Sequence, residues 1–217
     1  MPSVPDIRIH SDGQAWAEAA AEFVLEVGKE AVRANGRFLI ALSGGTTPES
    51  LYRALTSPAF ADRFDWSRTT FFFSDERCVP PDDPRSNYAL ADKTLFTPLR
   101  ITPSQIYRMA GESRDPEAAS EYEQQLRLAT KTSPSAKPSL DLILLGLGQD
   151  GHTASLFPGA PVLRDHQMCD CGNAISERSS QQTDHDPRCD QQGECDNVSR
   201  YGSPQSRSRE SHPRSED

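Results

Sequence analysis

The chain is short of apolar residues. Only 35% of its 217 residues are hydrophobic, whereas globular domains usually reach roughly 45–50% on a count that includes glycine. The shortage is concentrated after Arg164, because residues 165–217 contain no Leu, Phe or Trp and only one each of Met, Ala, Ile, Val and Tyr. Such a segment cannot bury enough apolar surface to offset the entropy lost on ordering. We therefore expect one α/β domain over residues 1–164, followed by a polar low-complexity tail over residues 165–217.

Long hydrophobic runs and basic patches are also missing. No apolar run approaches the length of a membrane span, and the N-terminus has no signal-peptide core. The net charge is −9, and no basic stripe with interleaved aromatic residues is present, which argues against a nucleic-acid-binding surface. We expect a cytoplasmic protein that binds neither nucleic acid nor membranes, and the sequence leaves its oligomeric state open.

Cysteine is almost absent from the first 164 residues, where Cys78 is the only one. The other four lie in the polar tail, where three histidines also occur, so a zinc site has to be considered. Their Cys-x-Cys and Cys-x5-Cys spacings do not match the paired short loops of structural zinc sites. We therefore expect no metal site from these residues, which are Cys169, Cys171, Cys189 and Cys195.

The hydrophobic pattern of the first 164 residues predicts alternating helices and strands. Apolar residues at three- and four-residue spacing predict an amphipathic helix over residues 14–35, which Gly36 ends. Thr47 is expected to cap a second helix, with Pro48 at its first position. Further helices are expected over residues 87–95 and 116–129. Strands are expected over residues 37–42 and 69–73 and from residue 141, the last of them buried. This order predicts an α/β fold with a mostly parallel sheet flanked by helices.

Three polar segments follow these strands. The first is SGGTTPES (Ser43 to Ser50), in which consecutive glycines free backbone N–H groups at a helix N-terminus. Such a loop suits a phosphate group, although a capped tight turn would have the same sequence. It is neither a Walker loop nor a dinucleotide fingerprint. The candidate phosphate-binding residues are Ser43, Gly44, Gly45, Thr46 and Thr47.

The second segment is SDER (Ser74 to Arg77), which places two carboxylates and a guanidinium after the next strand. Arg77 has the planar fork that suits phosphate or a developing oxyanion, and Asp75 is a candidate substrate-binding residue. A local cluster of salt bridges that orients the loop is an equally plain interpretation. Arg85 and Asn87, which follow a proline-rich loop, are further candidate substrate-binding residues, although a helix cap is the simpler explanation there.

The third segment, DLILLGLGQDGHTASLFPG (Asp141 to Gly159), follows the last predicted strand. Its glycines deliver Asp150, Gly151 and His152 together beyond a strand end, the place where open α/β sheets bind ligands. A titratable Asp-x-His pair there has the layout of a catalytic site, unless Asp150 only caps a helix. Since the three segments share one sheet edge, they predict a phosphorylated small substrate processed by a His–Asp pair.

These three segments resemble the 6-phosphogluconolactonase family. The resemblance rests on SGGTTPESLY, FFFSDERCVPPDDPRSNY and GLGQDGHTASLFPG, in this order, and extends to about Arg164. It implies a Rossmann-like fold and hydrolysis of 6-phospho-D-glucono-1,5-lactone to 6-phosphogluconate in the pentose phosphate pathway, without metal or organic cofactor. In the resulting hypothesis His152 is the general base, Asp150 orients it, Arg77 stabilises phosphate or oxyanion, and residues 43–47 hold the 6-phosphate. Gly151 is a further candidate substrate-binding residue.

Two alternatives come from related proteins. Glucosamine-6-phosphate deaminases share the SGGTT loop and the Asp-Gly-His, but typically continue His-Ile-Ala-Phe-Asn-Glu-Pro. Here the run from His152 to Pro158 is HTASLFP, so the deaminase's glutamate is missing. A non-catalytic phosphosugar-binding protein is the other alternative; as a regulator it would need a helix-turn-helix, and no such segment precedes Gln14.

Nothing from Asp165 onward matches the family pattern. Either the tail is a disordered extension or the reading frame has shifted between Asp165 and Cys171. Residues 183–217 can be back-translated with codons such that reading one nucleotide later gives a different amino-acid sequence. That sequence has the apolar pattern of two strands and a helix and is similar to the missing family segment. The frameshift hypothesis predicts that the sheet edge and apolar faces lose their cover, and that the activity of this chain is impaired.

Overall fold

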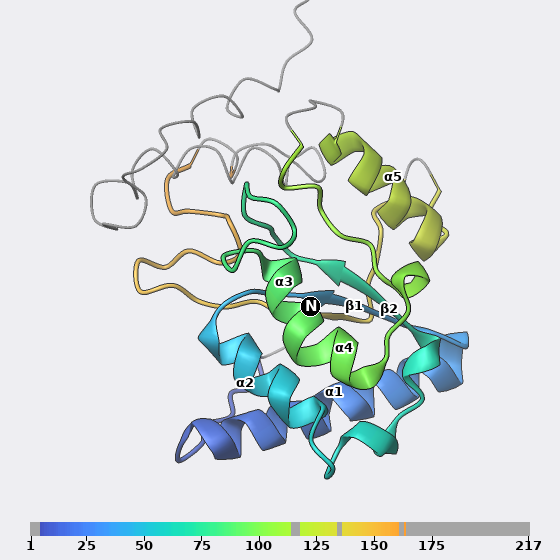
Figure 1. Ribbon diagram of the computed structural model, residues 1–217, viewed down its shortest axis with the longest axis vertical. Helices are drawn as coiled ribbons and strands as arrows, with labels where there is room; N and C mark the ends of the chain where they lie inside the picture. The colour runs from blue at the N-terminus through green and yellow to red at the C-terminus, as the bar shows by residue number, and fades with distance from the viewer. Residues whose placement is uncertain (1–4, 114–117, 134–135, 161–162, 164–217) are drawn as a thin grey trace, which may run out of the picture.

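The computed structural model describes residues 5–113, 118–133, 136–160 and 163, and Figure 1 shows their arrangement. At the centre is a three-stranded parallel sheet in the order β2-β1-β3. Its strands are β1 (Phe38–Leu42), β2 (Thr69–Phe73) and β3 (Leu142–Ile143). β1 pairs with β2 in the register Phe38↔Thr69 through Leu42↔Phe73, and with β3 at Ile40↔Leu142 and Ala41↔Ile143. The predicted α/β class and parallel sheet are therefore confirmed.

The helices begin and end close to where the sequence predicts them. α1 runs from Gly13 to Asn35, is capped by the Asp12 side chain, and ends at Gly36, whose φ of 73° needs a residue that tolerates the left-handed region. The other elements are α2 (Thr46–Leu55), α3 (Asn87–Ala91), α4 (Thr97–Leu99) and α5 (Ala118–Thr130), a π-helical turn at Asp92–Phe96, and short 3₁₀ turns at Ala61–Arg63, Trp66–Arg68 and Pro103–Gln105.

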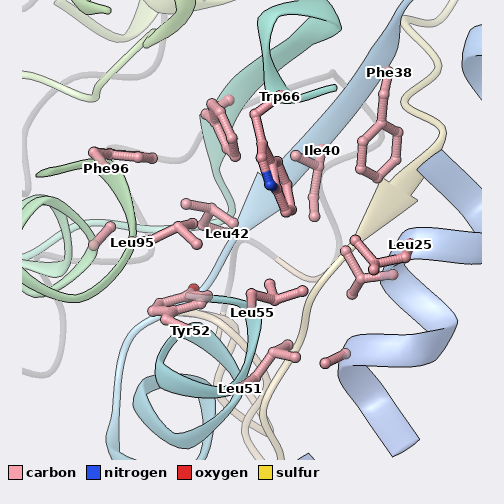
Figure 2. Close-up of a cluster of buried hydrophobic side chains, with 14 of the residues drawn as sticks. Leu25, Phe38, Ile40, Leu42, Leu51, Tyr52, Leu55, Trp66, Leu95 and Phe96 are labelled. Carbon is pink, nitrogen blue, oxygen red and sulfur yellow. The ribbon is translucent and has the colours of Figure 1, made fainter. Parts of the chain in front are cut away.

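The two faces of the sheet are covered unequally. One face carries the larger core, in which side chains of α1, α2 and the α3-to-α4 segment pack on alternate residues of β1 and β2. Figure 2 shows Leu25 of α1 and Leu51 and Leu55 of α2 facing Ile40 and Leu42 of β1. The opposite face carries a smaller cluster of Leu39, Ala41, Phe72, Met109, Tyr122 and Leu126, the last two from α5.

The prediction of a fully buried last strand is wrong. β3 has only two residues, and Leu142 and Leu144 contribute to the larger core. The side chains that alternate with them are uncovered: Ile143 is 51% exposed, Leu145 57% and Leu147 82%. No described element packs on this part of the sheet. The layer that would cover these apolar side chains is therefore not among the described residues. Strands of parallel sheets are normally covered on both faces.

Two buried tyrosines secure the carboxyl ends of β1 and β2. The Tyr52 hydroxyl accepts the Ser43 N–H (3.1 Å) and donates to the Ser43 carbonyl (2.6 Å). The Tyr122 hydroxyl makes the same pair of bonds with Phe73, at 2.9 and 3.0 Å. Burial raises the pKa of Tyr52, so this hydroxyl stays protonated and keeps its donor. Side chains of α2 and α5 thus replace sheet hydrogen bonds where the strands diverge.

No helix within the described ranges combines the length and apolar composition needed to span a membrane.

Candidate active site

The loop from Ser43 to Thr47 joins β1 to α2 and lies at the carboxyl edge of the sheet. The prediction that Thr47 caps α2 is wrong by two residues, because Gly45, with φ of 104°, is the N-cap and Thr46 is already helical. Gly45 has no side chain to cap this helix end, and uncapped N–H groups at a helix N-terminus are what an anion site uses. Thr46 and Thr47 line a cavity of about 280 Å³ together with Gly13, Trp16 and Ser50.

A buried carboxylate ties the second polar segment to α3. Glu76 is only 2% exposed, and each of its oxygens accepts two hydrogen bonds. Oε1 accepts from the backbone N–H groups of Arg77 and Asn87, both at 2.7 Å. Oε2 accepts from the Ser86 hydroxyl (3.0 Å) and the Tyr88 N–H (2.9 Å). The carboxylate therefore acts as a cap at the start of α3, where the helix dipole also favours negative charge.

Asp75, next to Glu76, connects the remaining segments. It is 7% exposed, and its Oδ2 accepts a hydrogen bond from the Ser155 hydroxyl at 2.9 Å. The Asn87 side-chain amide donates to the Asp75 carbonyl (3.0 Å) and lies 3.3 Å from Oδ1. Gly44 lies directly against this amide, since a Cβ built on Gly44 would come within 1.8 Å of Asn87 Oδ1. All three predicted segments are thus brought together at one edge.

The Asp-x-His pair is formed within a tight turn. Asp150 Oδ1 lies 2.5 Å from His152 Nδ1, and the His152 N–H also points to this oxygen at 3.3 Å. The turn is closed by hydrogen bonds from Gly148 N–H to the His152 carbonyl and from Gly151 N–H, at φ of 83°, to the Gly148 carbonyl. No helix begins at Asp150, so the alternative of a helix cap does not describe it. The His152 side chain is 34% exposed.

Gly148 is the residue that leaves room for this pair. A Cβ at position 148 would come within 2.1 Å of His152 Nδ1 and 2.8 Å of Asp150 Oδ1. The imidazole also lies against the Phe157 ring, with centroids 4.7 Å apart. Gly148 and Phe157 therefore define the position of the imidazole from two sides.

The two candidate arginines differ. The Arg77 side chain is exposed, and its guanidinium makes no hydrogen bond or ion pair with the described residues. Arg85 forms a two-pronged ion pair with Asp83, at 3.0 Å from Nε and 2.8 Å from Nη2. The side-chain hydrogen bond from Arg85 is the main reason that the pKa of Asp83 is lowered. Arg77 is thus the arginine with its charge free to meet an anion, whereas Arg85 holds its own loop.

Sequence reasoning did not single out Glu76, Ser155 or Gly148 as functional. Glu76 acts through its contacts with the start of α3, Ser155 through its hydrogen bond to Asp75, and Gly148 through its close approach to His152. Among the described residues, no group of three or more His, Cys, Asp or Glu side chains is arranged to hold a metal ion. The cysteines of the predicted tail lie outside the described residues.

Comparison with known proteins gives a consistent result. The sequence profile of a family described as glucosamine-6-phosphate isomerases/6-phosphogluconolactonase matches residues 11–183. The 6-phosphogluconolactonase of Treponema pallidum is 40% identical over 153 residues, covering 70% of this chain and 63% of the relative.

This chain belongs to that family. A probable 6-phosphogluconolactonase of Schizosaccharomyces pombe is 39% identical over 71% of this chain and 62% of its own length. The structure of 6-phosphogluconolactonase from Trypanosoma cruzi superposes with a TM-score of 0.64 at 30% identity, covering 74% of this chain and 65% of that one. The chain therefore spans less than two thirds of the length of these family members.

Replacement of Glu76 by Gln should destabilise the fold strongly. Whichever oxygen becomes an NH₂ group, two donors lose their acceptor, and at least one of them is a backbone N–H. At 1–3 kcal/mol for each unsatisfied donor, the free energy of unfolding should fall by about 2–6 kcal/mol. Urea unfolding measures it. The control is Glu49→Gln, which removes an exposed i,i+4 partner of Arg53 and should cost at most about 0.5 kcal/mol. Equal effects of the two variants would contradict the role of Glu76.

Replacement of Gly148 by Ala should separate His152 from Asp150 without unfolding the chain, because a side chain can swing away from the new methyl group. The downfield imidazole N–H proton resonance expected for the Asp150-bonded ring should disappear in the variant. Gly146→Ala is the matched control, since a Cβ there would meet nothing within 4 Å. Persistence of the resonance in Gly148→Ala would show that the turn accommodates a methyl group.

Proposed function

We propose that the chain is a 6-phosphogluconolactonase, which hydrolyses 6-phospho-D-glucono-1,5-lactone to 6-phosphogluconate in the pentose phosphate pathway. The hydrogen bond between Asp150 and His152 is the observation that carries the proposal. Because Nδ1 is held by the carboxylate, Nε2 is the nitrogen left to accept a proton. The Treponema pallidum and Schizosaccharomyces pombe relatives, both with lactonase names, support the same reaction.

The proposed first step is attack of water on the lactone carbonyl carbon. Nε2 of His152 takes a proton from the water as the C–O bond forms, and the carbonyl π electrons move onto its oxygen. Asp150 accepts the Nδ1 proton in a hydrogen bond and stabilises the imidazolium that results. Arg77 is assigned to the negative charge, either on the tetrahedral oxyanion or on the phosphate, because its guanidinium is exposed and has no partner among the described residues.

In the second step the tetrahedral intermediate collapses. The bond between the carbonyl carbon and the ring oxygen breaks, the ring oxygen takes the proton from the His152 imidazolium, and the product is the open-chain acid. No redox partner is needed. The loop of Ser43, Gly44, Gly45, Thr46 and Thr47 is proposed to hold the 6-phosphate at the N-terminus of α2. Asn87 and Gly151 shape the site, and Arg85 is proposed to act near its rim through the loop that it fixes to Asp83.

The deaminase alternative is less well supported. Positions after His152 bear Thr153, Ala154, Ser155 and Leu156, and no carboxylate follows before Pro158. The Treponema pallidum and Schizosaccharomyces pombe relatives are named as 6-phosphogluconolactonases and not as deaminases. A phosphosugar-binding protein without catalysis would use the same phosphate loop, but it would have no need of the Asp150–His152 pair.

Replacement of His152 by Ala should lower kcat by about 10²- to 10⁴-fold, the usual contribution of a general base. Proton release from freshly prepared 6-phosphogluconolactone, followed in a pH-stat and corrected for spontaneous hydrolysis, measures the rate. His10→Ala, a histidine ahead of α1, is the control and should leave the rate unchanged. If neither the wild-type chain nor a chain with the reading frame restored exceeds the spontaneous rate, the proposed activity is contradicted. A near-wild-type rate for His152→Ala contradicts the assignment of the base.

We also propose that residues 1–164 are an incomplete lactonase unit and that residues 165–217 are translated out of frame, even though the family profile match extends to residue 183. Two observations support this. The family members cited are longer than the matched part of this chain, and the described structure leaves Ile143, Leu145 and Leu147 exposed on the β3 side of the sheet. A continued chain with further strands and helices would cover these residues, whereas the polar composition after Asp165 offers little apolar surface to do so.

Resequencing the gene between the codons for Asp165 and Cys171 should reveal a one-nucleotide shift. A gene with the frame restored should yield a chain that is more soluble, has a higher Tm and hydrolyses the lactone faster, because the β3 face is then covered. The control for the effect of cloning alone is the natural gene, recloned with Gly146→Ala as its only change. An intact frame in the natural gene would overturn the hypothesis.

A further inference from the structure

Ser155 connects the His152 turn to the sheet edge by a hydrogen bond to Asp75. The last bond of this segment to β1 is from the Leu144 N–H to the Ala41 carbonyl, and further along the chain the Ser155 hydroxyl donates to Asp75 Oδ2 at 2.9 Å. The two residues are 80 positions apart and both are buried, with Ser155 9% exposed. Figure 1 shows this orange segment leaving the strands at the same end as the loop after β2.

The Asp75 end of this hydrogen bond is fixed. Asn87 donates to its carbonyl, and the neighbouring Glu76 carboxylate binds the start of α3. The Ser155 end is rigid for a different reason. Thr153 and Leu156 exchange hydrogen bonds of 3.2 and 2.9 Å around Ala154, whose φ of 49° lies in the left-handed region that alanine seldom adopts. Anchoring Ser155 therefore anchors the turn that carries His152.

We propose that Ser155 is a positioning residue, which holds the His152 imidazole at the reacting carbonyl by donating a hydrogen bond to Asp75. The proposal rests on the proposed lactonase function. It also gives Asp75 the role of a buried anchor, because Oδ2 is occupied by Ser155 and the Asn87 amide lies against Oδ1. Ser155 itself touches no reacting atom. Its loss should lower kcat and leave KM nearly unchanged, since the phosphate is bound by residues 43–47.

The test compares Ser155→Ala, Ser155→Thr and the control Ser67→Ala in the full chain. Ser67 also donates to an aspartate, Asp65 Oδ1 at 2.6 Å, but it lies in the turn that precedes β2. The first readout is native-state hydrogen exchange of the Gly148, Gly151, Thr153 and Leu156 amides. Exchange should accelerate by about 5- to 100-fold in Ser155→Ala and stay at the wild-type rate in the other two. Ser155→Cys, a weak donor of similar size, carries the same test if Ser155→Ala does not fold.

The second readout is steady-state lactone hydrolysis. We expect kcat of Ser155→Ala to fall by about 10- to 100-fold, because small displacements of a catalytic group cost rates of this order, and Ser155→Thr should restore it. Unchanged exchange in Ser155→Ala overturns the anchoring by this hydrogen bond. Accelerated exchange with unchanged kcat overturns the positioning role. Absence of hydrolysis in both the wild-type chain and a chain with the reading frame restored contradicts the proposed function instead, and the exchange rates then test the hydrogen bond between Ser155 and Asp75 on their own.

Discussion

The arrangement of the site depends on one buried charge, the Glu76 carboxylate at the N-terminus of α3. An unpaired carboxylate in a protein interior would be costly, and here the cost is offset by four donors, three of which are backbone N–H groups. Because the donors belong to the β2 loop and to the start of α3, the carboxylate fixes these two segments relative to each other. The positions of Asp75 and Asn87 follow directly from this fixation.

The same edge shows how a parallel sheet can open a site without leaving its backbone unsatisfied. Where β1 ends, its outward N–H and C=O groups no longer meet β3, and the Tyr52 hydroxyl takes the place of the missing strand. Tyr122 does the same for the last residue of β2. A hydroxyl can both accept and donate, so one tyrosine satisfies both groups of a residue. The strands can then diverge, and polar loops fill the opening.

The elements that the sequence predicts well are those with strong local patterns. α1 has regular apolar spacing and a glycine stop, and β2 agrees with its predicted range in full. The start of α2 was misplaced because the positive φ of Gly45 allows the helix to begin before Pro48. Glu76 and Ser155 escaped prediction since their partners are 10–12 and 80 residues away, and no local pattern marks such a contact. The predicted burial of Ile143 is wrong because an apolar strand is buried only when another element packs on it, and the sequence of the strand does not show whether such an element is present.

The site needs both a polar network that joins its loops and a layer of side chains that covers the β3 side of the sheet, and these two features come from different residues. The contacts that join Gly44, Asp75, Glu76, Asn87 and Ser155 all lie between described residues, in the part of the chain that carries the three motifs. What the described structure does not provide is a layer over Ile143, Leu145 and Leu147. These residues are on the same strand and loop that lead to the His152 turn. A loss of cover there would therefore act on the site through the stability of β3, which within the described ranges pairs with β1 and with no other strand.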